Sequence, residues 1–214
     1  MIHAYDKIYL EKARIALGRM LDFAVYDLNY DIDVFFRMFI TSGVAARFEK
    51  GDCSLLAGMS GVELTYKVLE NCGVNVERIK PKYVANRSRE YWMGWALAYY
   101  QWETSLHFAE IARYIPVKEI LALYTPYHEM DIRQFCDKMN EVYKTAKPET
   151  NLKLFRRNAG LSQRELSELS GVPVRTIQQY EQRQKNINKA QAEYLIMLSD
   201  VLCCEVIDLM EKVQ

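Results

Sequence analysis

The apolar residues of this chain recur with a helical period along nearly its whole length, and this feature most constrains the fold. Short alternating runs with Asn-Gly or Asp-Gly turns, which would indicate hairpins, are absent. Half of the 214 residues are hydrophobic and 26% are charged, so the chain can bury a core without disulfides or metal ions. The sequence therefore predicts an all-α fold.

A polar segment around Pro148 indicates a linker, with residues 1–147 forming one helical domain and residues 148–214 a second. A capping box at Ser60-Gly61-Val62-Glu63, a glycine stop at Gly73 and a first-turn proline at Pro116 mark helix ends in the first domain. We expect its helices at Tyr5–Tyr30, Asp31–Phe48, Gly61–Asn71, Arg89–Tyr114, Pro116–Tyr124 and Glu129–Lys144.

Five short helices are predicted in the second domain. The first is expected at Asn151–Asn158, the fourth at about Lys189–Leu202 and the fifth at Val206–Met210. The second should begin at the capping box Ser162-Gln163-Arg164-Glu165, and the third should begin at Pro173. Their periodicity predicts a core that includes Leu152, Phe155, Leu166, Leu169, Ile177, Tyr180, Ala192, Leu195, Ile196 and Leu198.

The turn Ser170-Gly171-Val172 joins the second and third of these helices. Gly171 stands where a helix ends with a positive φ, which glycine adopts at little cost. The third helix would direct Arg175, Gln178, Gln179 and Gln182 away from the core. Arginine can donate to guanine O6 and N7, and glutamine can pair with adenine N6 and N7, so this face suits base edges in a major groove.

Charge is unevenly distributed, although the formal net charge of the chain is zero. Residues 151–189 carry eight basic and three acidic side chains, whereas residues 190–214 carry one basic and five acidic ones. The basic part is where a polyanion would bind.

The segment from Leu161 to Glu181, LSQRELSELSGVPVRTIQQYE, resembles the helix-turn-helix of the Cro/lambda-repressor-like (XRE) family. The resemblance covers about residues 151–210 and implies a five-helix DNA-binding domain. It implies that Gln163 contacts phosphate and steadies the recognition helix, and that Val174, Arg175 and Thr176 face bases. It also implies that Gln178 and Gln179 reach bases or backbone, and that Arg156 and Glu181 form an ion pair between helices.

One position departs from the family pattern, because Arg183 stands where a glycine is frequent. Arg183 and Lys185 are then candidates for phosphate contacts. The full set of candidate DNA-binding residues is Arg156, Ser162, Gln163, Val174, Arg175, Thr176, Gln178, Gln179, Arg183 and Lys185. The alternative is a helix-turn-helix that binds protein instead of DNA, which fits the retained donors and basic residues less well.

The first domain contains no catalytic motif, and no cofactor or metal site is expected. Its aromatic segment Tyr91–Trp102 is either a central packed helix or a partner groove. The five cysteines fit neither a disulfide scaffold nor a zinc site, and Cys203 and Cys204 are expected in the core. Without a signal peptide or membrane span, we expect a cytoplasmic protein.

The leading hypothesis is a homodimeric, sequence-specific transcriptional repressor that binds double-stranded DNA. The first domain also resembles, distantly, toxin-associated helix-turn-helix proteins of Firmicutes. This resemblance implies an alternative, an antitoxin that neutralises a toxin through the first domain and autoregulates its operon. An enzyme is the third reading, and it would need an acid–base constellation that the sequence does not show.

Overall fold

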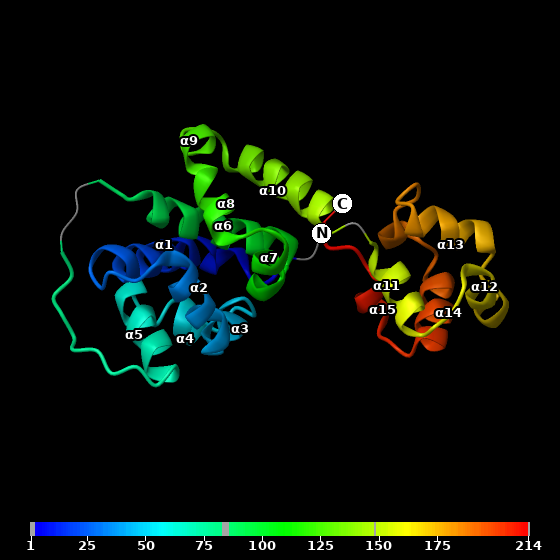
Figure 1. Cartoon of the computed structure of the whole chain (residues 1–214), viewed down its shortest axis with the longest axis horizontal. Coiled ribbons are helices and arrows are strands. Elements are labelled where there is room, and N and C mark those ends of the chain that lie inside the picture. Colours follow the sequence, from blue (N-terminus) through cyan, green and yellow to red (C-terminus); the bar gives the residue numbers. More distant parts are fainter. Residues whose placement is uncertain (1–2, 83–85, 148, 214) are drawn as a thin grey trace. The chain divides into compact units, whose positions relative to one another are not determined.

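The computed structural model describes residues 3–82, 86–147 and 149–213, and all regular elements within these ranges are helical (Figure 1). The all-α prediction is therefore confirmed. The chain divides into two compact units, Met1–Tyr143 and Lys144–Gln214. Within the same ranges, no helix is long and apolar enough to cross a bilayer.

The N-terminal unit is built around two long helices, α1 (Leu10–Tyr26) and α6 (Arg89–Thr104). The remaining elements are η1 (Lys7–Tyr9), α2 (Ile32–Thr41), α3 (Val44–Phe48), α4 (Cys53–Leu56), α5 (Gly61–Asn71), α7 (Phe108–Tyr114), α8 (Val117–Ala122), α9 (Tyr124–Tyr127) and α10 (Ile132–Ala146). Ser60 and Glu63 form the predicted capping box at the start of α5.

Glycines let α1 approach its neighbours closely. A Cβ added to Gly94 of α6 would lie 2.7 Å from the Leu17 carbonyl oxygen and 2.9 Å from the Gly18 Cα. A Cβ on Gly61 of α5 would lie 2.5 Å from the Ala16 carbonyl oxygen. Backbone atoms at these distances cannot move aside, so the two helix contacts depend on the missing side chains.

Two of the expected helices are each divided in the structure. The span 31–48 breaks at Gly43, which has a φ of 77° and begins α3. The span 89–114 breaks at Ser105, which has a φ of 55°, and α7 begins afterwards. The buried carboxylate of Glu49 accepts the Phe108 N–H at 2.9 Å and lies 2.6 Å from His107 Nδ1, which stabilises this second start.

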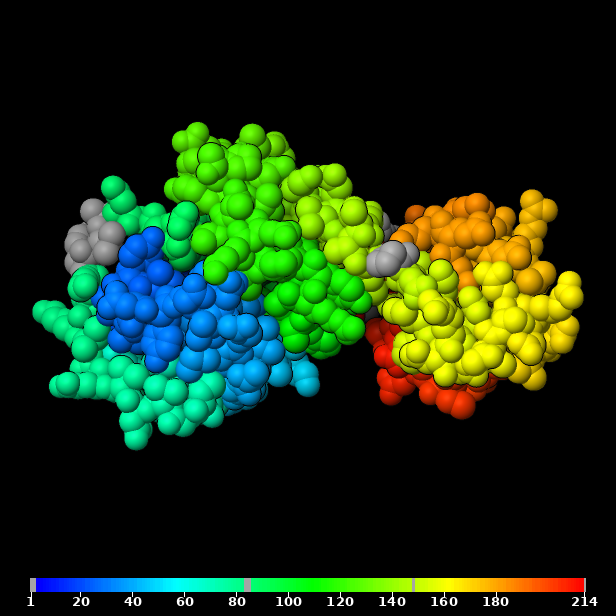
Figure 2. Space-filling model, in the orientation of Figure 1, coloured from blue at the N-terminus to red at the C-terminus, as the bar shows by residue number. Residues whose placement is uncertain are grey.

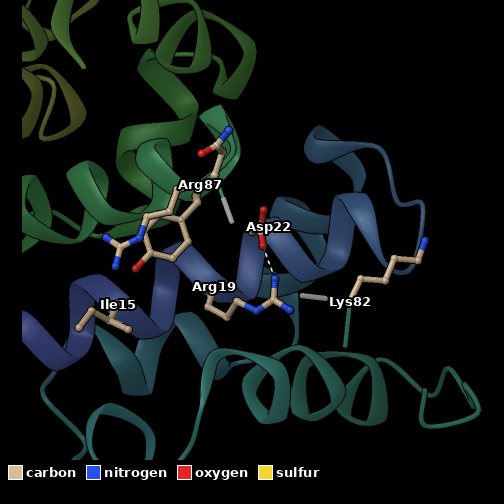
Figure 3. Close-up of a pocket in the computed structure, with 7 residues that line it drawn as sticks. Ile15, Arg19, Asp22, Lys82 and Arg87 are labelled. Atoms are coloured by element: carbon tan, nitrogen blue, oxygen red, sulfur yellow. Dashed lines mark hydrogen bonds and ion pairs between the residues drawn. The ribbon is translucent and has the colours of Figure 1, made fainter. Parts of the chain in front are cut away.

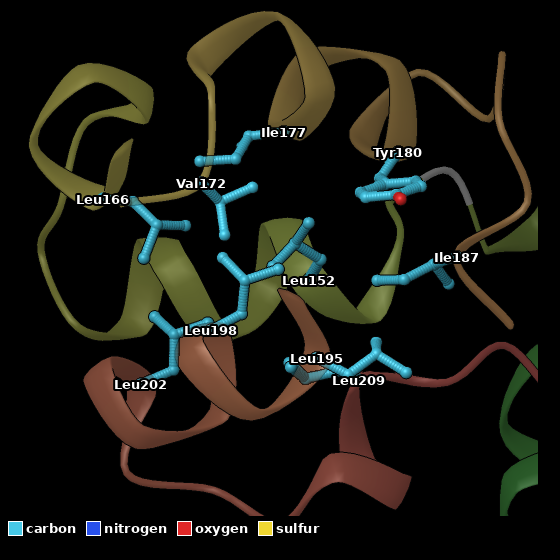
Figure 4. Packing of buried hydrophobic residues seen from close by; sticks show 10 residues of the cluster. All are labelled: Leu152, Leu166, Val172, Ile177, Tyr180, Ile187, Leu195, Leu198, Leu202 and Leu209. Atoms are coloured by element: carbon cyan, nitrogen blue, oxygen red, sulfur yellow. The ribbon is translucent and has the colours of Figure 1, made fainter. Parts of the chain in front are cut away.

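The C-terminal unit contains α11 (Asn151–Asn158), α12 (Gln163–Ser170), α13 (Val174–Glu181), η2 (Ile187–Lys189), α14 (Ala192–Leu202) and α15 (Val206–Leu209). These elements surround one apolar cluster (Figure 4). It consists of Leu152, Leu166, Val172, Ile177, Tyr180, Ile187, Leu195, Leu198, Leu202 and Leu209.

Four predictions for this core are wrong. Leu169 is 63% exposed and Ile196 is 53% exposed, and Ala192 also lies on the surface. An eight- to eleven-residue helix in a small domain buries a narrow stripe, which Leu166 and the Leu195–Leu198–Leu202 row already fill. Cys203 is exposed because it ends α14 in a left-handed conformation, with a φ of 51°.

Candidate nucleic-acid interface

Two side-chain hydrogen bonds and one buried side chain hold the turn between α12 and α13. Gly171 has a φ of 73°, as its place at the end of a helix predicts. The Ser167 hydroxyl donates to the Val172 carbonyl at 2.7 Å, and the Ser170 Oγ accepts the Val172 N–H at 3.3 Å. Val172 itself is fully buried, so the angle between the two helices is held by the core.

The start of α12 is the capping box that the sequence predicts. The Ser162 Oγ accepts the Glu165 N–H at 3.1 Å, and the Glu165 carboxylate accepts the Ser162 N–H at 2.7 Å. These hydrogen bonds lower the pKa of the Glu165 carboxyl below its ordinary value. The cap places Gln163 and Arg164 in the first turn of α12.

The α13 helix has one buried and one solvent-facing side. Ile177 is fully buried and Tyr180 is 7% exposed. On the other side Arg175 and Gln182 are exposed, Val174 is 38% exposed, and the intermediate positions are Thr176, Gln178 and Gln179. The segments of α12 and α13, yellow to orange in Figure 2, both reach the surface of the unit.

Arg175 is the clearest candidate for a base contact. Its side chain is exposed near the N-terminal end of α13, and it has no hydrogen-bond or ion-pair partner in the described part of the chain. All five donors of its guanidinium are therefore available for a ligand. Neighbouring Val174 offers only apolar contact, which suits a thymine methyl group.

A buried ion pair connects α11 to the end of α13. Arg156 Nε and Nη2 donate to the two Glu181 carboxylate oxygens at 2.6 and 2.9 Å, and Arg156 Nη1 donates to the Leu161 carbonyl at 2.7 Å. The Arg156 side chain is 10% exposed and that of Glu181 is 2% exposed. The Glu181 hydrogen bonds raise the pKa of the Arg156 guanidinium. This geometry supports a positioning role for Arg156 instead of direct contact with DNA.

The side-chain amides of Gln163 in α12 and Gln178 in α13 continue the hydrogen bonding from this ion pair. Gln163 Nε2 donates to Glu181 Oε2 at 2.8 Å, and Gln178 Nε2 donates to Gln163 Oε1 at 3.4 Å. Gln163 and Gln178 are both partly exposed. The resemblance implies the ion pair and a steadying role for Gln163, but it does not give Glu181 and Gln178 as the two hydrogen-bond partners of Gln163.

Arg183, a candidate for phosphate contact, forms a hydrogen bond to the backbone in the loop after α13. Its φ of 56° explains why glycine would suit this position. Its Nη2 donates to the Lys147 carbonyl at 3.0 Å, and Lys147 Nζ donates to Asn151 Oδ1 at 2.8 Å. Arg183 therefore binds the start of its own unit, whereas Lys185 is exposed two residues further on.

The N-terminal unit contains a cleft of about 260 Å³ between α1 on one side and Lys82 with residues 86–91 on the other (Figure 3). Its lining residues are Ile15, Arg19, Asp22, Lys82, Asn86, Arg87 and Tyr91. Arg19 pairs with Asp22, while the Arg87 guanidinium lies 4.5 Å from the centre of the Tyr91 ring. Among the described residues, the Lys82 ammonium and the Arg87 guanidinium have no acidic partner, although the Lys82 backbone N–H donates to the Asp27 carboxylate at 2.7 Å, so the cleft is positively charged at these two side chains. Within the same ranges, no cluster of His, Cys, Asp or Glu could hold a metal ion.

Comparison with known protein families identifies the C-terminal unit. Residues 152–202 match the family model described as helix-turn-helix. This segment covers α11 to α14, including the turn and the exposed face of α13. The unit is therefore a Cro/lambda-repressor-like helix-turn-helix domain.

The helix-turn-helix domain makes this protein a DNA-binding transcriptional regulator. No curated protein matches the chain, and no solved structure does. The family match lies entirely within the C-terminal unit and includes no residue of the N-terminal unit.

Proposed function

We propose that this protein is a sequence-specific repressor that binds operator DNA through α13. The observation that carries the proposal is the exposed face of α13, where an unpaired guanidinium lies beside amide side chains on a rigidly held helix. Donors of this kind pair with base edges, and a helix held by its core can enter a major groove without rearrangement.

Each candidate residue has a role in this proposal. Val174, Arg175, Thr176, Gln178 and Gln179 face the bases. Ser162, Gln163 and Lys185 contact phosphates at the edge of the groove, where contacts set the register without specifying sequence. Arg156 orients the helices from within the domain. Arg183, although also a candidate for phosphate contact, uses at least part of its guanidinium to bind the Lys147 carbonyl.

Two copies of the chain would place their α13 helices in successive major grooves of a near-palindromic operator. The N-terminal unit would then dimerise or bind an effector. The cleft that contains Lys82 and Arg87 is the place where a small anionic effector would bind, since the cations line a hollow beside the Tyr91 ring.

The substitution Arg175→Ala tests the repressor proposal directly. We expect operator affinity to fall by about 1–3 kcal/mol and base preference to be lost at the contacted position, because the guanidinium supplies the donors for a guanine. Selection of bound sequences from a random duplex library measures both effects.

Arg133→Ala is the matched control, because it removes an exposed arginine of α10, outside the helix-turn-helix. It should leave the selected sequence unchanged. An unaltered motif and affinity in Arg175→Ala would contradict the role of Arg175. The absence of any selected motif with the wild-type protein would contradict the repressor proposal.

The alternative function is an antitoxin, and one surface feature favours a protein partner. Ile8 is 71% exposed and Ile15 is 45% exposed, and they are seven residues apart at the start of the N-terminal unit. Ile8 belongs to η1 and Ile15 to α1, and exposed apolar side chains such as these can contribute to a protein contact. Co-expression with the product of a neighbouring gene would support this function if it gave a stable complex that relieved toxicity. A homodimer that forms no such complex would contradict it.

A further inference from the structure

The connection between α5 and α6, residues 72–88, concentrates positive charge within the N-terminal unit. It carries four basic side chains and one acidic one, whereas the rest of residues 1–143 carry thirteen basic and eighteen acidic side chains. Three of its cations, Arg78, Lys80 and Lys82, alternate within five residues that contain no acid. We call residues 78–82 the basic segment.

Two hydrogen bonds from its backbone hold the basic segment in place. The Ile79 N–H donates to the Tyr66 hydroxyl at 2.9 Å, and the Lys82 N–H donates to Asp27 Oδ1 at 2.7 Å. Both acceptors belong to buried side chains. The other Asp27 oxygen lies 3.7 Å from Arg19 Nη2, so this carboxylate is paired within the fold. A backbone fixed in this way lowers the entropy that the cations lose when they bind a partner.

The conformation of the basic segment spaces its three cations regularly. Residues 74–82 form neither helix nor turn, and Figure 1 shows them as an open trace along the edge of the unit. Lys80 precedes Pro81, which disfavours the helical region and favours an extended backbone. Alternate residues of an extended chain lie on the same side, about 6–7 Å apart. Successive phosphates along one strand of a duplex have a comparable separation.

The cations of the basic segment are available to a partner. Lys80 and Lys82 are exposed, and their ammonium groups have no acidic partner in the part of the chain that the structure describes. Arg78 pairs with Glu70 at 3.2 Å, but both of these side chains are more than half exposed. An ion pair in solvent is weak, so a phosphate can replace Glu70 at little cost.

We propose that the basic segment binds phosphates of duplex DNA beside the operator, a proposal that rests on the DNA binding assigned to α13. Such contacts add affinity without specifying sequence, and each one releases counterions. Duplex DNA is the favoured polyanion because the two units are consecutive in one chain. DNA bound by the C-terminal unit is therefore at a high effective concentration for the N-terminal unit.

The length of the operator duplex tests this proposal. Fluorescence anisotropy measures the affinity of the full chain for the operator alone and for the operator extended on each side by about 20 base pairs of arbitrary sequence, two helical turns. We expect the wild-type protein to bind the extended duplex about tenfold more tightly at low salt, with a steeper dependence of affinity on salt.

The double variant with Lys80→Gln and Lys82→Gln should lose most of the gain from the flanks. On the extended duplex, the slope of log affinity against log salt should become shallower by about one for each lysine removed. Affinity for the short operator should stay unchanged, because α13 binds it. Both substitutions retain the backbone N–H, so the Lys82 hydrogen bond to Asp27 is kept.

Lys7→Gln combined with Lys12→Gln is the matched control, because it removes the same charge from two exposed lysines of the same unit. It should keep the gain from the flanks. Circular dichroism and the thermal midpoint from tryptophan fluorescence check that both double variants remain folded. Lys82 also borders the cleft proposed for an anionic effector, so the buffer contains no phosphate or other multivalent anion.

The proposal is overturned if the flanks add no affinity for the wild-type protein. It is also overturned if the Lys80 and Lys82 substitutions leave the gain intact, or if the control substitutions reduce it equally. A wild-type protein that selects no operator at all contradicts the proposed function itself, so the two failures are distinguishable.

Discussion

At the scale of single residues, the Arg156–Glu181 pair differs from the ion pairs on the surface. Both of its side chains are withdrawn from water, and each satisfies several hydrogen bonds of the other. When one member of a buried pair is removed, the remaining charge keeps its desolvation cost and loses its compensation. Removing one partner of this pair should therefore destabilise the C-terminal unit more than removing one partner of a surface ion pair.

The substitution Arg156→Ala should lower the unfolding free energy of the C-terminal unit by about 3–5 kcal/mol, because it leaves the Glu181 carboxylate buried and unpaired. Denaturant unfolding followed by far-ultraviolet circular dichroism measures the change. The three tryptophans, Trp92, Trp95 and Trp102, all belong to the N-terminal unit, so their fluorescence reports that unit separately.

Arg157→Ala is the control for this prediction. Arg157 is the next residue of α11 and pairs with Glu149 at 2.7 Å, but its side chain is 62% exposed. Its removal should cost less than about 1 kcal/mol, as is usual for an ion pair in solvent. Equal effects of the two substitutions would contradict the distinction between the pairs.

Residue-level patterns predict features that depend on nearby sequence. The Ser162–Glu165 cap and the left-handed Gly171 each follow from a few consecutive residues, and both are confirmed. The exposure of Leu169 and Ile196 depends on how many other helices cover each face of their own helix. The period of the apolar residues does not give that number. The contact between Gln163 and Gln178 depends on the distance between two helices, and it was not predicted for the same reason.

At the scale of elements, helix breaks were the least predictable feature. The apolar period continues through residues 104–108, so the sequence indicates one helix from Arg89 to Tyr114. The structure ends α6 at Thr104 because a carboxylate from a distant part of the chain, Glu49, accepts the first N–H of α7. Caps supplied by the neighbouring residue are visible in sequence, whereas caps supplied across the fold are not.

The contact between α1 and α6 gives a prediction for the N-terminal unit. Gly94→Ala should destabilise this unit by about 1–2 kcal/mol, since the overpacking cost exceeds the gain of about 1 kcal/mol in helix propensity. The new methyl group would meet the Leu17 carbonyl oxygen and the Gly18 Cα, which are backbone atoms.

Thermal unfolding followed by tryptophan fluorescence measures this effect, and operator affinity of the folded protein below the transition serves as the control. We expect a lower midpoint with unchanged affinity. An equal or higher midpoint would mean that α1 and α6 separate readily enough to accept the methyl group.

At the scale of the whole molecule, the two units have different proposed roles. The C-terminal unit carries the proposed DNA-binding face, and the N-terminal unit has its own core around α1 and α6. Composition and linker chemistry indicate two domains, but they do not identify the partner of the first. The candidate DNA-binding residues, by contrast, come from one short motif whose spacing is visible in the sequence.

The proposed homodimer predicts a fixed distance between operator half-sites. Two α13 helices in successive major grooves require half-site centres about 34 Å apart. Inserting about five base pairs rotates one half-site by half a helical turn and should lower affinity at least about tenfold. Fluorescence anisotropy with labelled duplexes measures the change, and a single half-site bound as tightly as the full operator would contradict the dimer.

The glycine contact between α1 and α6 also has a consequence for evolution. Sequences that keep this N-terminal architecture can replace most surface residues, but they cannot add a side chain at Gly18 or Gly94 without separating the two helices. Distant homologues should therefore retain this pair after overall identity has faded. A search weighted toward these two positions is a practical route to the ancestry of the domain.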